Sequence, residues 1–75
     1  PAGANATIRF AALNEWVKID IYDQQNRKVL EVYDGNLNQG RHDIKMNTES
    51  LPAGTYVVLI RKESGTVHST LVRVN

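Results

Sequence analysis

Alternation of apolar and polar residues is the feature that most constrains how this chain folds. Four stretches show it, and their members at every second position are Ile8, Phe10 and Ala12; Val17, Ile19 and Ile21; His42, Ile44 and Met46; and Tyr56, Val58 and Ile60. A period of two is typical of a β-strand that buries one of its faces. No stretch of useful length keeps the 3.6-residue period of an amphipathic helix. The pattern therefore predicts an all-β protein.

Turn-forming residues separate the alternating stretches, at positions 13–15, 23–26, 34–40, 47–54 and 63–65. Asp23 and Asp34 stand at turn starts, and Asn26 tolerates the positive φ of a tight hairpin. Gly35 and Gly40 are expected to set the geometry of the long loop 34–40. With strands at 29–33 and 67–74, the count predicts an immunoglobulin-like antiparallel β-sandwich of six to seven strands. Residues 1–5 are interpreted as a leader into the first strand.

Length, charge and cysteine content narrow the possible functions. The 75 residues are enough for one domain, which we place at residues 1–75, and the lack of an initial Met suggests a fragment or processed product. Lys and Arg number 9 against 8 Asp and Glu, with no basic run, so nucleic acid is not an expected partner. The absence of Cys excludes disulfides and thiolate chemistry. No apolar run approaches the roughly 18 residues of a membrane span.

Residue types that carry catalysis are present but not grouped. His42 and His68 are the two histidines, they lie on different predicted strands, and a metal site needs three or four convergent ligands. The acidic residues are scattered, and the serines lack the Gly-x-Ser-x-Gly context of a nucleophile. We therefore predict no catalytic residue, no metal, no cofactor and no enzyme activity.

A structural role is predicted for one turn before a strand. It is formed by the stretch Leu51-Pro52-Ala53-Gly54-Thr55-Tyr56, which we call the Tyr56 corner. Pro52 presets φ for a turn, and Gly54 accepts a positive φ if the turn needs one. In sandwich folds a Tyr at such a corner often donates its hydroxyl hydrogen to nearby backbone, and Tyr56 is expected to do so.

Three aromatic residues leave two interpretations open. Trp16 and Tyr22 lie on the polar side of one predicted strand, and Tyr33 lies on the next. Such residues cover a second contact surface more often than they bind a ligand. A carbohydrate-binding platform would require all three side chains to project from one accessible face.

Five segments of the chain match, in order and spacing, the sequence pattern of one known family. Residues 35–42 fit the motif "g-x-l-x-x-G-x-h" and residues 51–56 fit the motif "L-p-x-G-x-Y". Residues 17–29 fit a hairpin before these motifs, residues 69–75 fit a closing strand, and Pro1-Ala2 fit the end of an opening "Asn-Pro" segment. Together they resemble the C-terminal sorting domains of the type IX secretion system. Related immunoglobulin-like domains of flagellar hook-capping proteins share much of the pattern. Asn26 stands where the family usually has Gly, which Asn can replace because it also visits the left-handed region.

The resemblance implies that the domain is a sorting signal and has no catalytic activity. Such domains follow a passenger protein in Bacteroidetes-type bacteria, pass through the periplasm and are recognised by an outer-membrane translocon. A sortase-like cysteine peptidase then usually removes them, and the passenger reaches the cell surface or the medium, often joined to anionic lipopolysaccharide. The expected partners are thus the translocon, the peptidase and the N-terminal passenger.

The residues expected to carry recognition are those of the resembling corner, loop and terminal strand: Gly35, Gly40, Leu51, Pro52, Gly54, Tyr56, Leu71, Val72, Arg73, Val74 and Asn75. The terminal strand at 67–74 has apolar residues on both faces, which suits a strand covered on both sides by its own fold or by a receptor. An exposed terminal strand is read by strand addition or is exchanged between two copies in a swapped homodimer. The alternative function is a structural, adhesive or carbohydrate-binding module of a multidomain surface protein.

Overall fold

Six β-strands account for the regular structure of the chain in the computed structural model, which describes the backbone of residues 5–73 and the side chains of residues 6–68. The strands are β1 (Asn5–Ala12), β2 (Glu15–Tyr22), β3 (Lys28–Leu37), β4 (Gly40–Asn47), β5 (Gly54–Lys62) and β6 (Gly65–Arg73). Within this range there is no helix, and hence none that could cross a membrane. The all-β prediction is confirmed.

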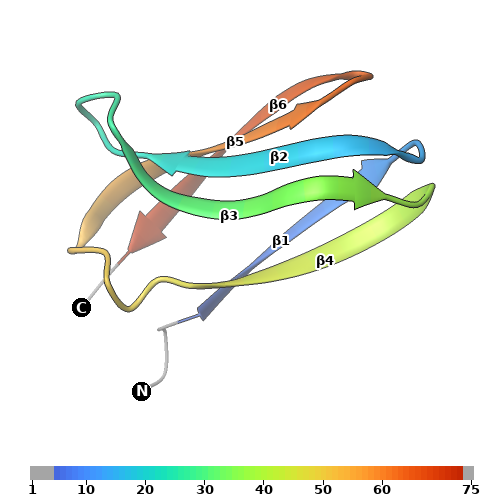
Figure 1. Ribbon diagram of the computed structural model, residues 1–75. Coiled ribbons are helices and arrows are strands. Elements are labelled where there is room, and N and C mark those ends of the chain that lie inside the picture. The colour runs from blue at the N-terminus through green and yellow to red at the C-terminus, as the bar shows by residue number, and fades with distance from the viewer. Residues whose placement is uncertain (1–4, 74–75) are drawn as a thin grey trace.

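The strands form two antiparallel sheets that face each other (Figure 1). One sheet has four strands in the order β3-β2-β5-β6, and the other has two, β1 and β4. Strands β3 and β6 therefore form the edges of the larger sheet. The two sheets together make the predicted β-sandwich.

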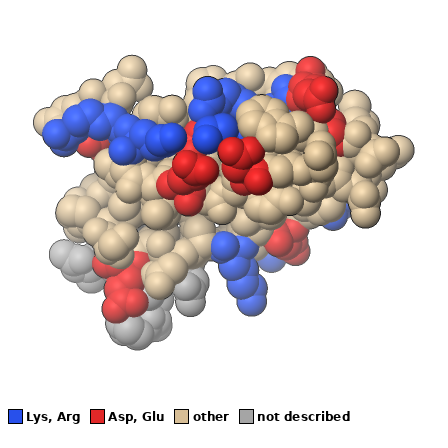
Figure 2. Space-filling model, viewed as in Figure 1, with Lys and Arg blue, Asp and Glu red and all other residues tan. Residues whose placement is uncertain are grey.

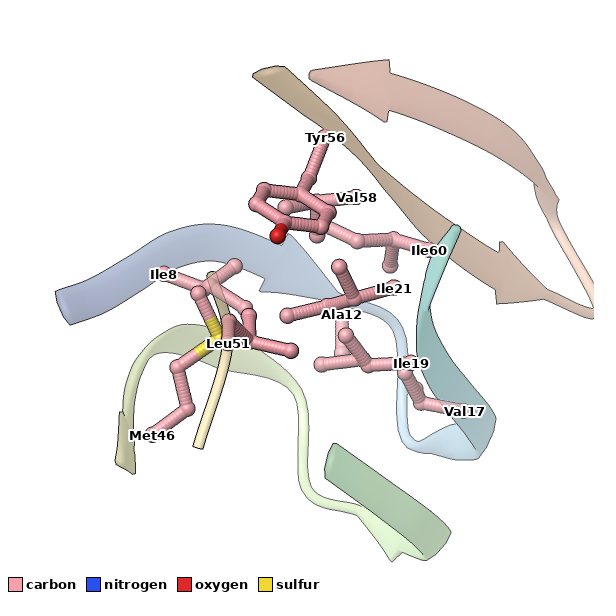
Figure 3. Close-up of a cluster of buried hydrophobic side chains, with 10 residues drawn as sticks. All are labelled: Ile8, Ala12, Val17, Ile19, Ile21, Met46, Leu51, Tyr56, Val58 and Ile60. Atoms are coloured by element: carbon pink, nitrogen blue, oxygen red, sulfur yellow. The ribbon is translucent and has the colours of Figure 1, made fainter. Parts of the chain in front are cut away.

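The core lies between the sheets and is built by the alternating residues (Figure 3). Val17, Ile19 and Ile21 of β2 are completely buried and stand at the centre of the larger sheet. Apolar side chains from both sheets and from the 48–53 connection pack against them: Ile8, Ala12, Met46, Leu51, Tyr56, Val58 and Ile60. Burial of alternate residues fixes the pairing register, because a slip of one residue would expose the whole apolar face.

Strand β3 is longer than the sequence suggested, which corrects the expected loop at 34–40. Residues 34–37 continue β3 along β2, so that Gly35 pairs with Val17 and only residues 38–39 connect β3 to β4. Asp34 consequently lies within a strand and starts no turn. The Asp-Gly-Asn composition is typical of loops, but pairing with the central strand outweighs that weak local preference.

Two register shifts interrupt the β2–β3 pairing and change which face β3 presents. Tyr33 pairs with Ile19, whereas Glu31 pairs with Asp20, so Val32 is an extra residue on β3. Glu31 and Tyr33 are two positions apart and would share a face in a regular strand, but the bulge places them on opposite faces. Tyr33 thus packs against the core.

The predicted turns are otherwise found, with changes at their ends. Asn26 has a φ of 66° in the β2–β3 hairpin, and the Asp23 carboxylate accepts hydrogen bonds from the backbone N–H groups of Gln25 and Arg27 at 2.9 Å each. Glu15 begins β2 rather than ending a turn. Asn5 belongs to β1, so it is no leader residue, and residues 1–4 lie outside the described range.

Candidate recognition surface

The Tyr56 corner adopts the arrangement expected from its sequence. The Tyr56 hydroxyl donates a hydrogen bond of 2.5 Å to the carbonyl oxygen of Pro52, four residues earlier. Leu51 is buried in the core, while Pro52 and Gly54, which follow it in the chain, are exposed. The corner therefore anchors the connection between the two sheets and presents its Pro and Gly to the surface.

Gly40 and Gly35 serve different purposes from each other. Gly40 begins β4 with a φ of 133°, which L side chains rarely adopt, so it permits the two-residue connection between β3 and β4. Gly35 sits beside Tyr33, and a Cβ atom there would lie 3.3 Å from the Tyr33 hydroxyl oxygen. Gly35 thus leaves room for a core-facing ring within a strand, which is not the role in a loop that we expected.

The terminal strand β6 lies at an edge of the four-stranded sheet. It pairs with β5 from Gly54↔Arg73 to Lys62↔Gly65, and no other strand among the described residues pairs with it. Leu71, Val72 and Arg73 belong to this strand; Val74 and Asn75 lie outside the described residues. The backbone N–H and C=O groups along its outer side are therefore open to another strand.

A buried carboxylate that the sequence analysis did not single out closes the β5–β6 hairpin. Glu15 accepts hydrogen bonds from the Ser64 backbone N–H at 2.7 Å, the Ser64 hydroxyl at 2.9 Å and the Leu13 backbone N–H at 2.8 Å. Burial raises the pKa of Glu15, but the hydrogen bonds from Ser64 and Leu13 outweigh this and leave its pKa below the ordinary value of 4.5. Glu63 completes the contact by accepting the Trp16 backbone N–H at 2.8 Å. The hairpin that begins β6 is thus fixed to the start of β2.

Charged side chains on the outer face of the larger sheet form a second feature missed in the sequence. Asp20 is completely buried there, 2.7 Å from the Arg61 guanidinium and 3.8 Å from the Lys28 ammonium. Lys18 lies 3.7 Å from both Glu31 and Asp34. Figure 2 shows basic and acidic side chains interleaved where β2 and β3 run in Figure 1. These charges were scattered in sequence and meet only because β3, β2 and β5 are neighbours.

The aromatic residues do not share one face, which removes the carbohydrate platform. Trp16 lies on the outer face, where its indole N–H donates a 2.8 Å hydrogen bond to Asp34. Tyr33 lies on the opposite, core-facing side of the same sheet because of the β3 bulge. The parity of residues along β3 could not reveal this.

The two histidines also lie apart in the structure. His42 packs its ring 6.0 Å from that of Phe10 and makes a 2.7 Å hydrogen bond with the Asn38 carbonyl oxygen, while His68 is exposed on β6. In the part of the chain that the structure describes, no three His, Asp or Glu side chains are grouped as metal ligands.

A hydrogen-bonded corner, a clamped hairpin and an open edge strand are thus the distinctive parts of this small β-sandwich. A family model described as a secretion system C-terminal sorting domain matches residues 1–74, and the chain belongs to this family. The domain of this family is the C-terminal sorting signal for type IX secretion, and the protein that carries it is exported to the cell surface or secreted. No curated protein and no solved structure matches the chain significantly.

Proposed function

We propose that residues 1–75 form one sorting domain that the outer-membrane translocon of the type IX system recognises by protein–protein contact. The edge strand β6 is the element that is read, because its outer backbone groups have no partner strand among the described residues. An extended segment of a receptor satisfies such groups by strand addition. The position of β6 at the sheet edge is the observation that carries this proposal.

The domain acts as a substrate of the secretion machinery and has no catalytic role of its own. It follows its passenger through the periplasm, is recognised at the outer membrane and is then cut from the passenger by the sortase-like peptidase. The family assignment supports this course of events. The corner of Leu51, Pro52, Gly54 and Tyr56, with Gly35 and Gly40, holds the sandwich in the shape that presents β6.

A reporter fusion tests the proposal in a host with a working type IX system. A fluorescent passenger carries the full chain in one strain and the chain without residues 71–75 in another, and surface delivery is measured by protease accessibility. We expect delivery of the full fusion and loss of delivery on truncation. Equal delivery of both forms would remove the terminal strand from the mechanism, and no delivery of the full fusion would favour the structural or adhesive module.

Folding of the two fusions must be compared, because truncation also shortens β6. Circular dichroism of the purified 75-residue and truncated chains provides this control. If the truncated chain is unfolded, the substitution Arg73→Pro at the end of β6 replaces it, since Pro lacks a backbone N–H and disfavours strand pairing. Delivery of that variant at the level of the unchanged fusion would contradict the proposal.

A further inference from the structure

A groove of about 290 Å³ opens between the edge strands of the two sheets, β1 and β6. Its lining residues are Ala6, Thr7, Ile8, Arg9 and Phe10 of β1, the core-facing Met46, Val58, Ile60 and Val67, and His68. His68 pairs with Leu59 and follows the core-facing Val67, so its side chain points to the outer face of β6. Figure 3 shows four of these side chains, Ile8, Met46, Val58 and Ile60, within the core cluster. The groove is thus an opening into the core along one side of the sandwich.

Five consecutive residues of β1 line the groove, from Ala6 to Phe10. Consecutive residues of a strand point to opposite faces, so a cavity over one face would be lined by alternate residues only. A run of five means that the groove follows the edge of β1. This strand pairs with β4 on one side, and no other described strand pairs with it. The groove therefore exposes a row of backbone N–H and C=O groups.

The opposite wall shows that the sandwich is incomplete on this side. Val67 pairs with Ile60, so both point toward the core, yet Ile60 is 2% exposed and Val67 is 43% exposed. The smaller sheet has two strands where the larger has four, and it leaves the inner face of β6 uncovered at Val67. One more strand beside β1 would cover this position.

We infer that this groove receives an extended segment of the translocon, which adds to the free edge of β1 as a third strand of the smaller sheet; the inference rests on the proposed function. Paired backbone groups supply affinity in strand addition, and side-chain pockets supply specificity. The site deepens the proposal because it places recognition on β1 as well as on β6. A receptor strand there would lie between the two free edges of the domain.

The lining defines the chemistry of the inserted segment. An apolar cavity of about 150 Å³ holds one benzene molecule, so the groove accepts the side chains of about two alternating apolar residues. Arg9 is its charged lining residue and already lies 3.5 Å from Asp43, so the groove requires no acidic partner. Each described strand of a second copy is already paired within its own sandwich. A strand of a second copy would bring the rest of its sandwich with it, whereas a free extended segment of another protein fits the groove without such bulk.

Two lysine substitutions on edge strands test the inference. Val67→Lys places a charge in the groove, and an inward-pointing charge is a device by which sheets block strand addition. Val29→Lys is the matched control, because Val29 is 38% exposed on β3, the edge strand at the other side of the same sheet. We expect a tenfold or greater loss of reporter delivery for Val67→Lys and less than a twofold change for Val29→Lys. Thermal unfolding of both variant chains establishes that each is folded.

The outcomes separate failure of the groove from failure of the proposed function. If truncation of residues 71–75 abolishes delivery but Val67→Lys behaves as Val29→Lys, the groove inference is wrong and the sorting function stands. A photo-crosslinking residue at position 67, followed by mass spectrometry of the joined peptides, identifies the occupant. Peptides from an extended translocon segment support the inference, and peptides from a second copy of this chain overturn it.

Discussion

At the scale of single residues, Asp20 shows how the outer face of a sheet can hide a charge. Its side chain is completely buried, although it points away from the core formed by Ile19 and Ile21. Arg61 and Lys28 reach it from the neighbouring strands, and the side chains of both cations remain 42% exposed. The carboxylate therefore loses contact with water while its partners retain it.

Replacing this carboxylate tests how much it stabilises the fold. Asp20→Asn removes the buried charge and leaves Arg61 and Lys28 without it. We expect a loss of about 2 kcal/mol in the free energy of unfolding, less than for a fully buried ion pair, because both cations can turn to water. Asp43→Asn at the exposed Arg9–Asp43 pair is the control, with a change within about 0.5 kcal/mol. Urea denaturation measures both, and equal small effects would contradict the expectation.

Acid sensitivity follows from two carboxylates with lowered pKa values. Backbone hydrogen bonding to Arg27 is the main cause for Asp23, whose pKa lies below its ordinary value of 3.8; Glu15 lies below 4.5 because its hydrogen bonds outweigh burial. A folded-state pKa below the unfolded one stabilises the fold at pH above the unfolded value. That stabilisation is lost as the pH falls through the folded value.

We therefore expect the melting temperature to be level down to about pH 4.5 and to fall below it. Glu15→Gln should lower the melting temperature near neutral pH and flatten the fall at acid pH, because the residue that titrates is gone. Glu49→Gln, at an exposed site in the 48–53 connection, is the matched control. An unchanged acid slope in Glu15→Gln would contradict this assignment.

At the scale of elements, β3 shows where sequence patterns mislead. Alternation located β1, β2, β4 and β5, because each buries one regular face. Strand β3 carries two register shifts and the loop-like residues 34–37, so its parity and its end both differ from the pattern. A bulge forms only when two strands pair, so the residues of β3 alone could not predict its bulge or its pairing partners. The same reason explains why the Asp20 and Glu15 contacts were not foreseen, whereas the local Tyr56 corner was.

The β5–β6 hairpin determines whether β6 can be exchanged between two copies. Exchange requires the two-residue connection Glu63-Ser64 to open, and Glu15 holds it closed through Ser64. Glu15→Ala should therefore produce a dimer whose fraction rises with concentration, as strand exchange does when a hinge is released. Light scattering after size-exclusion chromatography measures it, with Glu49→Ala as the control. A Glu15→Ala chain that stays monomeric at millimolar concentration would argue against exchange of β6.

At the scale of the whole molecule, the sandwich class followed from four alternating stretches, two further predicted strands and the turns between them. The division into one sheet of four strands and one of two could not be predicted from the sequence, because the order of strands in a sheet is set by long-range contacts rather than by local pattern. The groove beside β1 is a consequence of that division and was equally hidden. Function was reached through resemblance of the corner, hairpin and closing segments, which a family match over residues 1–74 confirms.

Both ends of the described chain emerge at one pole of the sandwich. Asn5 pairs with Asn47 and Arg73 pairs with Gly54, and only the six residues 48–53 join Asn47 to Gly54. A passenger that precedes the domain would therefore be attached at the end of the sandwich where β6 ends. A bulky passenger on a short tether would screen the last residues of β6 from a receptor. If β6 is read as proposed, the length of the tether between passenger and domain becomes a physical control on export.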